Sequence, residues 1–250
     1  MRINEAVALV TGANRGIGRA LVTEFLSRGA ARVHAAARDP RTLEPLVAEA
    51  PDRIVPLALD ITDPAAVTAA AEAAPDVTLL VNNAGRHAMG HLLDMDLADV
   101  EEVMRTNWLG TLRVLRAFAP VVERNGGGAV ANLISIGAFG GTAAMGPYPA
   151  SKAALALLTQ AVRVDLAPRG ITVHGVFPGP VETDMLRYAA GHLHDIDAIP
   201  VASAADAARA IADGIEAGDE EIFPDPYARE IQEGLRTDPK GVERLLLSME

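Results

Sequence analysis

Ala-Val-Ala-Leu-Val-Thr-Gly-Ala-Asn-Arg-Gly-Ile-Gly at residues 6–18 joins an apolar run to a glycine-rich turn. The apolar run predicts a buried strand, and the composition of residues 17–28 predicts a helix. Glycines allow positive φ values, and they let backbone N–H groups approach a phosphate at the start of a helix. Because this turn lies between a strand and a helix, its Gly-x-x-x-Gly-x-Gly spacing predicts a dinucleotide site.

The same alternation of apolar runs and helical segments continues along most of the chain, and it predicts parallel strands with right-handed crossovers. The expected strands are residues 6–10, 32–37, 54–59, 77–81, 129–134, 171–177 and a short one at 221–223. The expected helices are residues 17–28, 41–50, 64–74, 97–124 and 149–167. We therefore predict an α/β fold for residues 1–250: a single doubly wound Rossmann-like domain, with a parallel sheet of about seven strands and helices on both faces.

The C-terminal tail at residues 225–250 has a different pattern. Asp225-Pro226 and Asp238-Pro239 each resemble a helix N-cap followed by proline at the first helical position. We expect two short helices here, which would cover the edge of the sheet or a partner subunit.

The composition excludes several classes of function. The 250 residues include no cysteine, which excludes disulfides, thiolate metal sites and a cysteine nucleophile. The formal net charge of −11 disfavours nucleic acid and anionic lipid as partners. The first apolar run ends at Val10 and is too short for a signal sequence or a membrane span. We expect a cytoplasmic protein.

The residues after the second expected strand, Ala-Ala-Arg-Asp at 36–39, indicate which dinucleotide binds. An acidic residue at this point would bind the ribose 2′-OH and select NAD. Arg38, together with Arg15 of the glycine-rich turn, instead offers guanidinium donors for a 2′-phosphate. The sequence therefore favours NADP, and ribose binding by Asp39 is the alternative.

A tyrosine and a lysine mark a candidate catalytic helix. Lys152 is one of only two lysines in the chain and follows Tyr148 by four residues. Residues four apart share a face of a helix, so the ammonium and the phenol can meet. A cation beside a phenol lowers the phenol's pKa, which predicts Tyr148 as a proton donor and acceptor near neutral pH.

With these motifs in order, residues 5–185 resemble the short-chain dehydrogenase/reductase family in its short form. The motifs are Thr11 to Gly18, Asp60, Asn82-Asn83-Ala84-Gly85, Asn107, Ser135, the Tyr148/Lys152 pair, and Pro178-Gly179 with Thr183. The resemblance implies a catalytic set of Ser135, Tyr148 and Lys152, with Asn107 positioning a water. The implied cofactor-binding residues are Gly12, Asn14, Arg15, Gly16, Ile17, Gly18, Arg38, Asp60, Ile61, Asn83, Ala84, Gly85, Tyr148, Lys152, Pro178, Gly179, Val181 and Thr183.

These residue types suit carbonyl reduction. Hydride addition to a carbonyl builds negative charge on oxygen, which needs a hydrogen-bond donor and then a proton. Ser135 can donate the hydrogen bond and Tyr148 the proton. We therefore expect an NADPH-dependent oxidoreductase that reduces a ketone or other carbonyl to a secondary alcohol. The alternatives are a 3-oxoacyl thioester (acyl-carrier) reductase and a catalytically silent cofactor-binding regulator, which would be expected to lose Tyr148 or Lys152.

By the same resemblance, residues 86–95, 136–147 and a substrate loop at 184–200 would form the substrate pocket. Their mostly apolar side chains predict a small hydrophobic carbonyl substrate; they are Met89, Leu92, Phe139, Met145, Met185, Leu186 and Tyr188. Arg86 and Arg187 are the nearby cations, and Arg187 could meet the phosphate of an acyl carrier.

Two histidine pairs raise the question of a metal site. His87/His91 and His192/His194 are conceivable metal ligands by residue type, but we expect pocket lining or solvent exposure and no metal site.

Phe-Pro-Asp-Pro at 223–226 replaces the Asp-Gly-Gly that many family members carry, which argues against tetramer packing through that segment. We expect a homodimer joined through residues 97–124 and 149–167.

Overall fold

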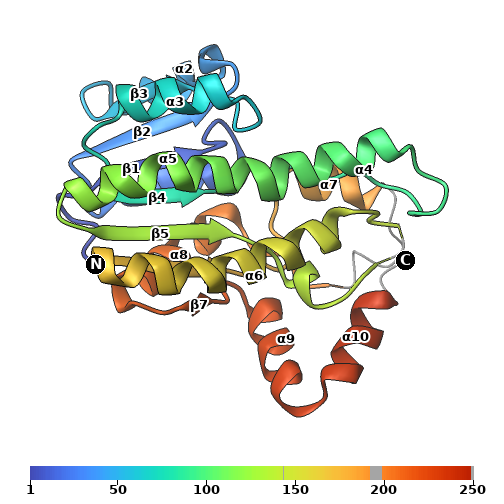
Figure 1. Ribbon diagram of the computed structural model, residues 1–250. Coiled ribbons are helices and arrows are strands. Elements are labelled where there is room, and N and C mark those ends of the chain that lie inside the picture. The colour runs from blue at the N-terminus through green and yellow to red at the C-terminus, as the bar shows by residue number, and fades with distance from the viewer. Residues whose placement is uncertain (143, 192–198, 249–250) are drawn as a thin grey trace.

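The computed structural model describes residues 1–142, 144–191 and 199–248. In this part of the chain the buried apolar runs form one parallel sheet in the order β3-β2-β1-β4-β5-β6-β7 (Figure 1). The strands are β1 Val7–Thr11, β2 Arg32–Ala37, β3 Ile54–Ala58, β4 Leu79–Asn82, β5 Gly128–Leu133, β6 Ile171–Val176 and β7 Glu221–Ile222. The order reverses between β1 and β4, so a crevice is expected at the carboxyl ends of these two strands.

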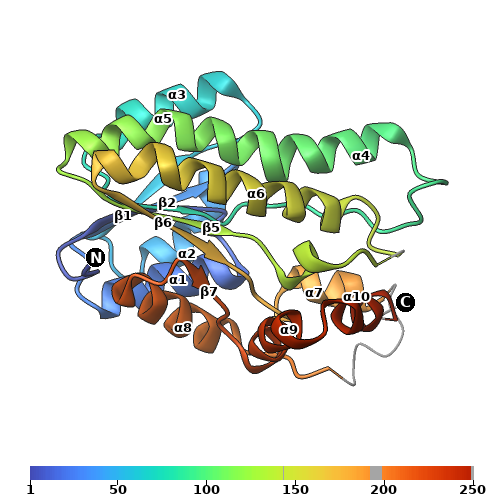
Figure 2. The same cartoon turned by 60° about the horizontal axis from the view of Figure 1, so that its bottom comes forward.

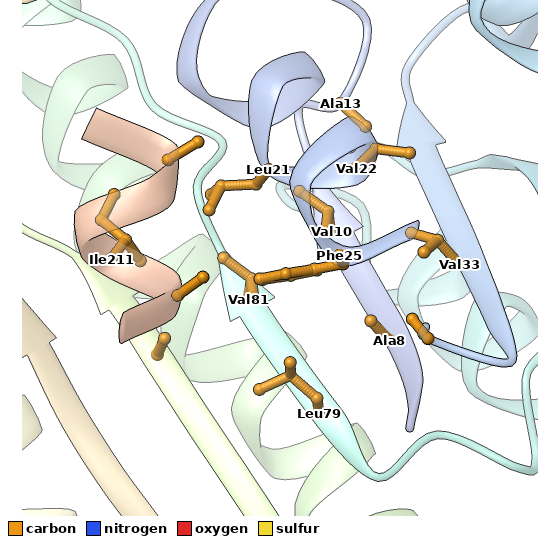
Figure 3. Packing of buried hydrophobic residues seen from close by; sticks show 14 of the residues in the cluster. Ala8, Val10, Ala13, Leu21, Val22, Phe25, Val33, Leu79, Val81 and Ile211 are labelled. Atoms are coloured by element: carbon orange, nitrogen blue, oxygen red, sulfur yellow. The ribbon is translucent and has the colours of Figure 1, made fainter. Parts of the chain in front are cut away.

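Alternating side chains of each strand bury against helices on opposite faces of the sheet. Leu9 packs with one set of helices and Val10 with the other. Figure 2 shows the two helical layers, and Figure 3 shows Phe25 and Ile211 in the layer that covers the Val10 face. On the Leu9 face lie α3 Pro64–Ala73, α4 Leu97–Met104, α5 Thr111–Arg124 and α6 Tyr148–Leu166; on the Val10 face lie α1 Gly16–Ser27, α2 Glu44–Val47 and α8 Ala204–Ala217. The predicted fold class, a single doubly wound Rossmann-like domain, is confirmed.

Two of the predicted helices differ from the structure. Residues 41–50 were expected to form one helix, but Pro40–Leu43 is a 3-10 helix and α2 is only four residues long. Pro45 explains the break, because proline lacks an N–H and its ring clashes with the preceding turn. The expected helix at 97–124 is continuous but contains a π-helical turn at Arg105–Gly110, between α4 and α5. Such turns often occur at functional sites.

The C-terminal tail forms the two predicted helices, α9 Pro226–Thr237 and α10 Pro239–Leu247. The predicted N-caps are confirmed: Asp225 accepts a hydrogen bond from the Ala228 amide at 2.8 Å, and Asp238 accepts one from the Gly241 amide at 2.9 Å. Figure 1 shows this helical pair below α6 and β7. A further helix, α7, spans Asp184–Ala190. None of the helices in the described ranges has the length and apolar character needed to cross a bilayer.

Candidate active site

A cleft of about 960 Å³ opens at the carboxyl ends of the strands, where the strand order reverses. Ligand pockets usually hold roughly 300–1,000 Å³, so this cleft is large enough for an extended ligand. Nearly all the predicted site residues line it; those that do are Gly12, Asn14, Arg15, Gly16, Ile17, Arg38, Asp60, Ile61, Asn83, Ala84, Gly85, Ser135, Tyr148, Lys152, Pro178, Gly179, Val181 and Thr183. Gly18 and Asn107 are buried behind its wall.

The glycine-rich turn has the geometry of a phosphate cradle. Gly12 has a φ of +65°, and a Cβ at Gly18 would lie 2.3 Å from the carbonyl oxygen of Gly12, so neither position accepts a side chain without strain. The side-chain Nδ2 of Asn83 donates to the carbonyls of Thr11 and Gly12, at 2.8 and 3.1 Å. Helix α1 begins at Gly16 with no side-chain cap, and its first N–H groups therefore suit an anion. The turn fits the pyrophosphate of a dinucleotide.

Charged side chains gather near the glycine-rich turn. Arg15 pairs with Asp184 at 3.5 Å, and both side chains are largely exposed. The carboxylate of Asp39 accepts from Nε and Nη2 of Arg41, at 2.9 and 2.7 Å. In the described part of the chain, no carboxylate lies within ion-pair distance of Arg38. The exposed Arg38 guanidinium is therefore the cation best placed to meet an added anion.

Asp60 stands after β3 at the same end of the cleft. Its carboxylate accepts from the amide and the hydroxyl of Thr62, at 2.8 and 2.7 Å. Although burial alone would raise it, the pKa of Asp60 is lowered by these hydrogen bonds and by the charge of Arg38. Asp60 therefore stays ionised and fixed in orientation.

Ser135 and Tyr148 meet at the opposite end of the cleft. Ser135 follows β5 and caps the 3-10 helix Ile136–Phe139, because its Oγ accepts from the Gly137 amide at 3.1 Å. Tyr148 is the first residue of α6, and its side chain lies close enough to the Ser135 hydroxyl for that group to lower the pKa of the phenol. A strand end and a helix start thus bring the two hydroxyl groups together.

The pKa of Tyr148 differs from the sequence expectation. Burial raises the pKa of the phenol to about 12, and the Ser135 hydroxyl offsets this only in part. The prediction that Lys152 lowers this pKa is wrong for the described arrangement, because removal of the phenolate from water is the largest effect. Tyr148 is therefore protonated at neutral pH, as a proton donor must be.

Lys152 lies one helical turn beyond Tyr148, as the four-residue spacing predicts. Its Nζ donates to the carbonyl oxygen of Leu133 at 2.7 Å and lies 5.6 Å from the centre of the Tyr148 ring. Burial lowers the pKa of the ammonium to about 8. Because Nζ has three hydrogens and Leu133 takes one, two remain for other oxygens in the cleft.

Asn107 occupies the π-helical turn and is fully buried. Its Oδ1 accepts from the Arg86 amide at 2.7 Å, and its Nδ2 donates to the Arg86 carbonyl and to Ser151 Oγ, both at 2.8 Å. Both Nδ2 hydrogens are therefore used, and Asn107 ties the segment after β4 to α6. One lone pair of Oδ1 stays available. The positioning of a water by Asn107 stays a prediction.

Asp225 makes a hydrogen bond to the cleft wall at Gly179, a contact that the sequence did not predict. Its side chain is 2% exposed and accepts from the Gly179 amide at 2.7 Å while it caps α9 through the Ala228 amide. The N-cap pattern identified the second contact but gave no sign of the first, which joins residues 46 positions apart. Asp225 thereby fastens the Pro178-Gly179 segment to the C-terminal tail.

Removal of this carboxylate is expected to destabilise the fold. Asp225→Ala would leave one buried and one partly buried N–H group without an acceptor, at a cost of about 2–4 kcal/mol in the free energy of unfolding. Asp238→Ala is the matched control, because it removes an exposed cap of α10 and is expected to cost about 1 kcal/mol. Urea titration of both variants measures the difference, and equal losses would contradict the clamping role.

The substrate end of the cleft agrees with the expected walls only in part. Met145, Met185, Leu186 and Tyr188 line the cleft as predicted, and Arg86, His87, Thr142 and Ala189 of the same expected segments line it too; Leu246 lies outside those segments. Phe139 was expected there but stacks on Phe177 with ring centres 5.0 Å apart. Leu92 is half exposed, and Met89 packs against the cluster around Ala189.

The histidines do not gather into a metal site in the described residues. There, no group of three or more His, Asp or Glu side chains is placed to hold a metal ion. The ring of His87 lies edge-on to those of Tyr148 and Tyr188, with centres 6.4 and 5.0 Å apart. The expected pair His192/His194 lies outside the described residues.

Comparisons with known proteins agree with this fold. Residues 6–192 match the family model of short chain dehydrogenases. Galactitol 2-dehydrogenase (L-tagatose-forming) of Cereibacter sphaeroides is 38% identical over 196 residues, 74% of each chain. A 3-oxoacyl-(acyl-carrier-protein) reductase of Vibrio cholerae is 32% identical over 191 residues, 75% of this chain and 78% of that one.

A solved structure extends the likeness to nearly the whole chain. A short chain dehydrogenase from Burkholderia cenocepacia, crystallised in complex with NADP, superposes with a TM-score of 0.87 at 36% identity, and covers 99% of both chains. The family match spans well over half of the sequence and includes the glycine-rich turn, Ser135, Tyr148 and Lys152. The protein therefore belongs to the short-chain dehydrogenase family of oxidoreductases.

Proposed function

We propose that the protein is an NADPH-dependent reductase that converts a ketone or another carbonyl to a secondary alcohol. The observation that carries the proposal is the meeting of Ser135, Tyr148 and Lys152 at one end of a cleft that has the glycine-rich turn and Arg38 at its other end. When bound, NADPH supplies the hydride that reduces the carbonyl carbon.

The three side chains have distinct roles in this proposal. The Ser135 hydroxyl donates a hydrogen bond to the carbonyl oxygen and so stabilises the negative charge that develops there. Tyr148 gives its proton to that oxygen, and its pKa of about 12 keeps the proton on the phenol until it is needed. The Lys152 ammonium keeps two hydrogens beyond the one donated to Leu133, and these suit ribose hydroxyls of the cofactor.

The choice of NADP over NAD is supported by the arginines. Arg38 has no carboxylate partner in the described residues, and the carboxylate of Asp39 is held by Arg41. Asp39 is therefore poorly available for a ribose hydroxyl, whereas Arg38 is available for a 2′-phosphate. The NADP complex of the Burkholderia cenocepacia relative supports the same choice.

The proposed substrate is neutral and mostly hydrophobic. Met145, Leu186 and Tyr188 contribute apolar surface to the cleft. The two cations predicted near the substrate are already paired, Arg86 with Asp99 at 3.4 Å and Arg187 with Asp184. An anionic substrate would therefore have to compete with a protein carboxylate for either guanidinium.

A substrate screen tests this proposal. We expect aryl and alkyl ketones to be reduced with kcat/KM values at least tenfold above those of keto acids, because the two arginines predicted near the substrate, Arg86 and Arg187, are already paired with carboxylates. The measurement is NADPH or NADH oxidation with ketones, keto acids, ketoses and 3-oxoacyl thioesters. Faster reduction of the keto acids would overturn the substrate class.

A 3-oxoacyl thioester reductase is the second candidate, supported by the Vibrio cholerae relative. The same substrate screen distinguishes this candidate from a ketone reductase, because a thioester reductase would give its highest kcat/KM with the 3-oxoacyl thioester. A silent cofactor-binding regulator would bind NADPH with no turnover of any carbonyl.

We also propose a homodimer through α4, α5 and α6. Leu97 on α4 and Leu157 and Val164 on α6 are large apolar side chains with most of their surface exposed, and burial of such surface favours association. Sedimentation of the wild-type protein tests this assembly. The cytoplasmic location stays a prediction.

A further inference from the structure

The C-terminal tail does more than cover the sheet, because α10 reaches the catalytic end of the cleft. Val242 and Leu246 of α10 belong to an apolar cluster with Ile136, Phe177 and Phe223. Ile136 directly follows Ser135, so this cluster lies beside the catalytic hydroxyls. Figure 2 shows α9 and α10 at the end of the molecule where α6 begins.

Leu246 is held against the segment that follows Ser135 by two independent contacts. Its carbonyl oxygen accepts from the Thr142 hydroxyl at 3.0 Å, a buried hydrogen bond between residues 104 positions apart. A Cβ at Gly140 would lie 2.9 Å from the Cβ of Leu246, so glycine is needed for this close approach. The position of Leu246 relative to Ser135 is therefore fixed by packing and by hydrogen bonding.

Leu246 is one of the residues that line the cleft, although it is only 3% exposed. Thr142 lines the same cleft, so the two residues form one continuous surface beside the substrate end. The neighbouring Leu247 points elsewhere and is 42% exposed. One leucine of α10 therefore faces the cleft, and an adjacent leucine serves as an internal control.

We infer that Leu246 is a specificity-determining residue, which forms the apolar end wall of the substrate pocket and limits the size of the group attached to the carbonyl. This inference rests on the proposed carbonyl reduction. Residue 246 lies outside residues 6–192, which match the family model. The proposed size limit therefore comes from a segment that the family model does not cover.

The physical consequence is a change of size preference. Shortening Leu246 to alanine removes three carbon atoms from the wall and makes room for a larger substituent. A difference of one methylene in an apolar pocket changes kcat/KM by roughly 10–200-fold. We therefore expect Leu246→Ala to raise the ratio of kcat/KM for a bulky ketone to that for a small one by about tenfold or more.

The test uses a series of methyl ketones with progressively longer alkyl groups and the full-length protein. The variants are Leu246→Ala, Leu246→Val and the control Leu247→Ala, each measured for kcat/KM along the series and for the KM of NADPH. We expect the optimum to move to longer ketones in Leu246→Val and further in Leu246→Ala, with an unchanged KM for NADPH. Leu247→Ala should keep the wild-type optimum.

Because Leu246 also packs in the core, circular dichroism is used to check that each variant folds. If Leu246→Ala does not fold, the size preference of Leu246→Val tests the inference instead. An unchanged optimum in a folded Leu246 variant overturns the inference while the proposed function stands. A shift of equal size in Leu247→Ala also overturns it, because the effect would then come from general loosening of α10. If the wild-type protein reduces no ketone, the proposed function fails and this inference fails with it.

Discussion

The Tyr148→Phe variant is expected to reduce ketones about 10²- to 10⁴-fold more slowly than the wild type, the range typical of a lost general acid. Only the phenolic oxygen is removed, and the ring keeps its place at the start of α6. Ser135 could still hold the carbonyl, but no proton would be delivered to the developing alkoxide. The measurement is kcat for ketone reduction with saturating NADPH.

Two controls show that this loss is chemical. NADPH affinity, measured by fluorescence titration, should change little, because Arg38 and the glycine-rich turn lie at the other end of the cleft. Tyr227→Phe removes the same atom from a buried tyrosine of α9 and should keep nearly wild-type turnover. Full activity in Tyr148→Phe would refute the role of Tyr148.

The Arg38→Ala variant is expected to bind NADPH roughly 10- to 150-fold more weakly, with almost no change for NADH. A charge-assisted hydrogen bond contributes about 1.5–3 kcal/mol, which corresponds to this range. The effect is specific because only NADPH carries the 2′-phosphate. In a chain with a net charge of −11, local donors rather than the overall field must hold this anion. Dissociation constants for both cofactors provide the measurement.

Arg41→Ala is the matched control for this variant. Arg41 is an exposed arginine three residues further on, but its guanidinium is occupied by Asp39. Its removal should leave NADPH affinity nearly unchanged and make Asp39 more available to a ribose hydroxyl. An unaltered NADPH/NADH affinity ratio in Arg38→Ala would contradict the assignment and favour recognition through Asp39.

The features that sequence predicts well here are local. The glycine-rich turn, the N-caps at Asp225 and Asp238, and the Tyr148/Lys152 spacing each depend on residues within one turn or one helix. Strand-helix alternation then determines the fold class, because parallel strands need crossover helices. The cleft follows from the reversal of strand order, so the residues at its floor could be listed in advance.

The features that sequence did not predict depend on the environment of a side chain. Burial raises the pKa of Tyr148, and the degree of burial cannot be read from its four-residue spacing to Lys152. The π-helical turn around Asn107 is held by hydrogen bonds to Arg86 and Ser151, which lie 21 and 44 residues away. Neither contact has a recognisable sequence pattern.

The substrate walls were predicted only in part, for the same reason. Phe139 has the residue type and the location of a pocket residue, but its ring joins the stack of Phe177 and Phe223. Leu246 belongs to the C-terminal tail, for which the sequence predicted only coverage of the sheet edge or of a partner subunit. Its approach to the cleft depends on Thr142 and on the absence of a side chain at Gly140.

The most direct test follows the hydrogen that is transferred. NADPH carrying deuterium at the transferable position of its nicotinamide is incubated with a hydrophobic ketone and either the wild-type or the Tyr148→Phe protein, and the alcohol is analysed by mass spectrometry. We expect one deuterium on the carbinol carbon with the wild-type protein and almost no alcohol with the variant. Alcohol without deuterium, or equal deuterated product from both proteins, would contradict reduction by hydride transfer with Tyr148 as the proton donor.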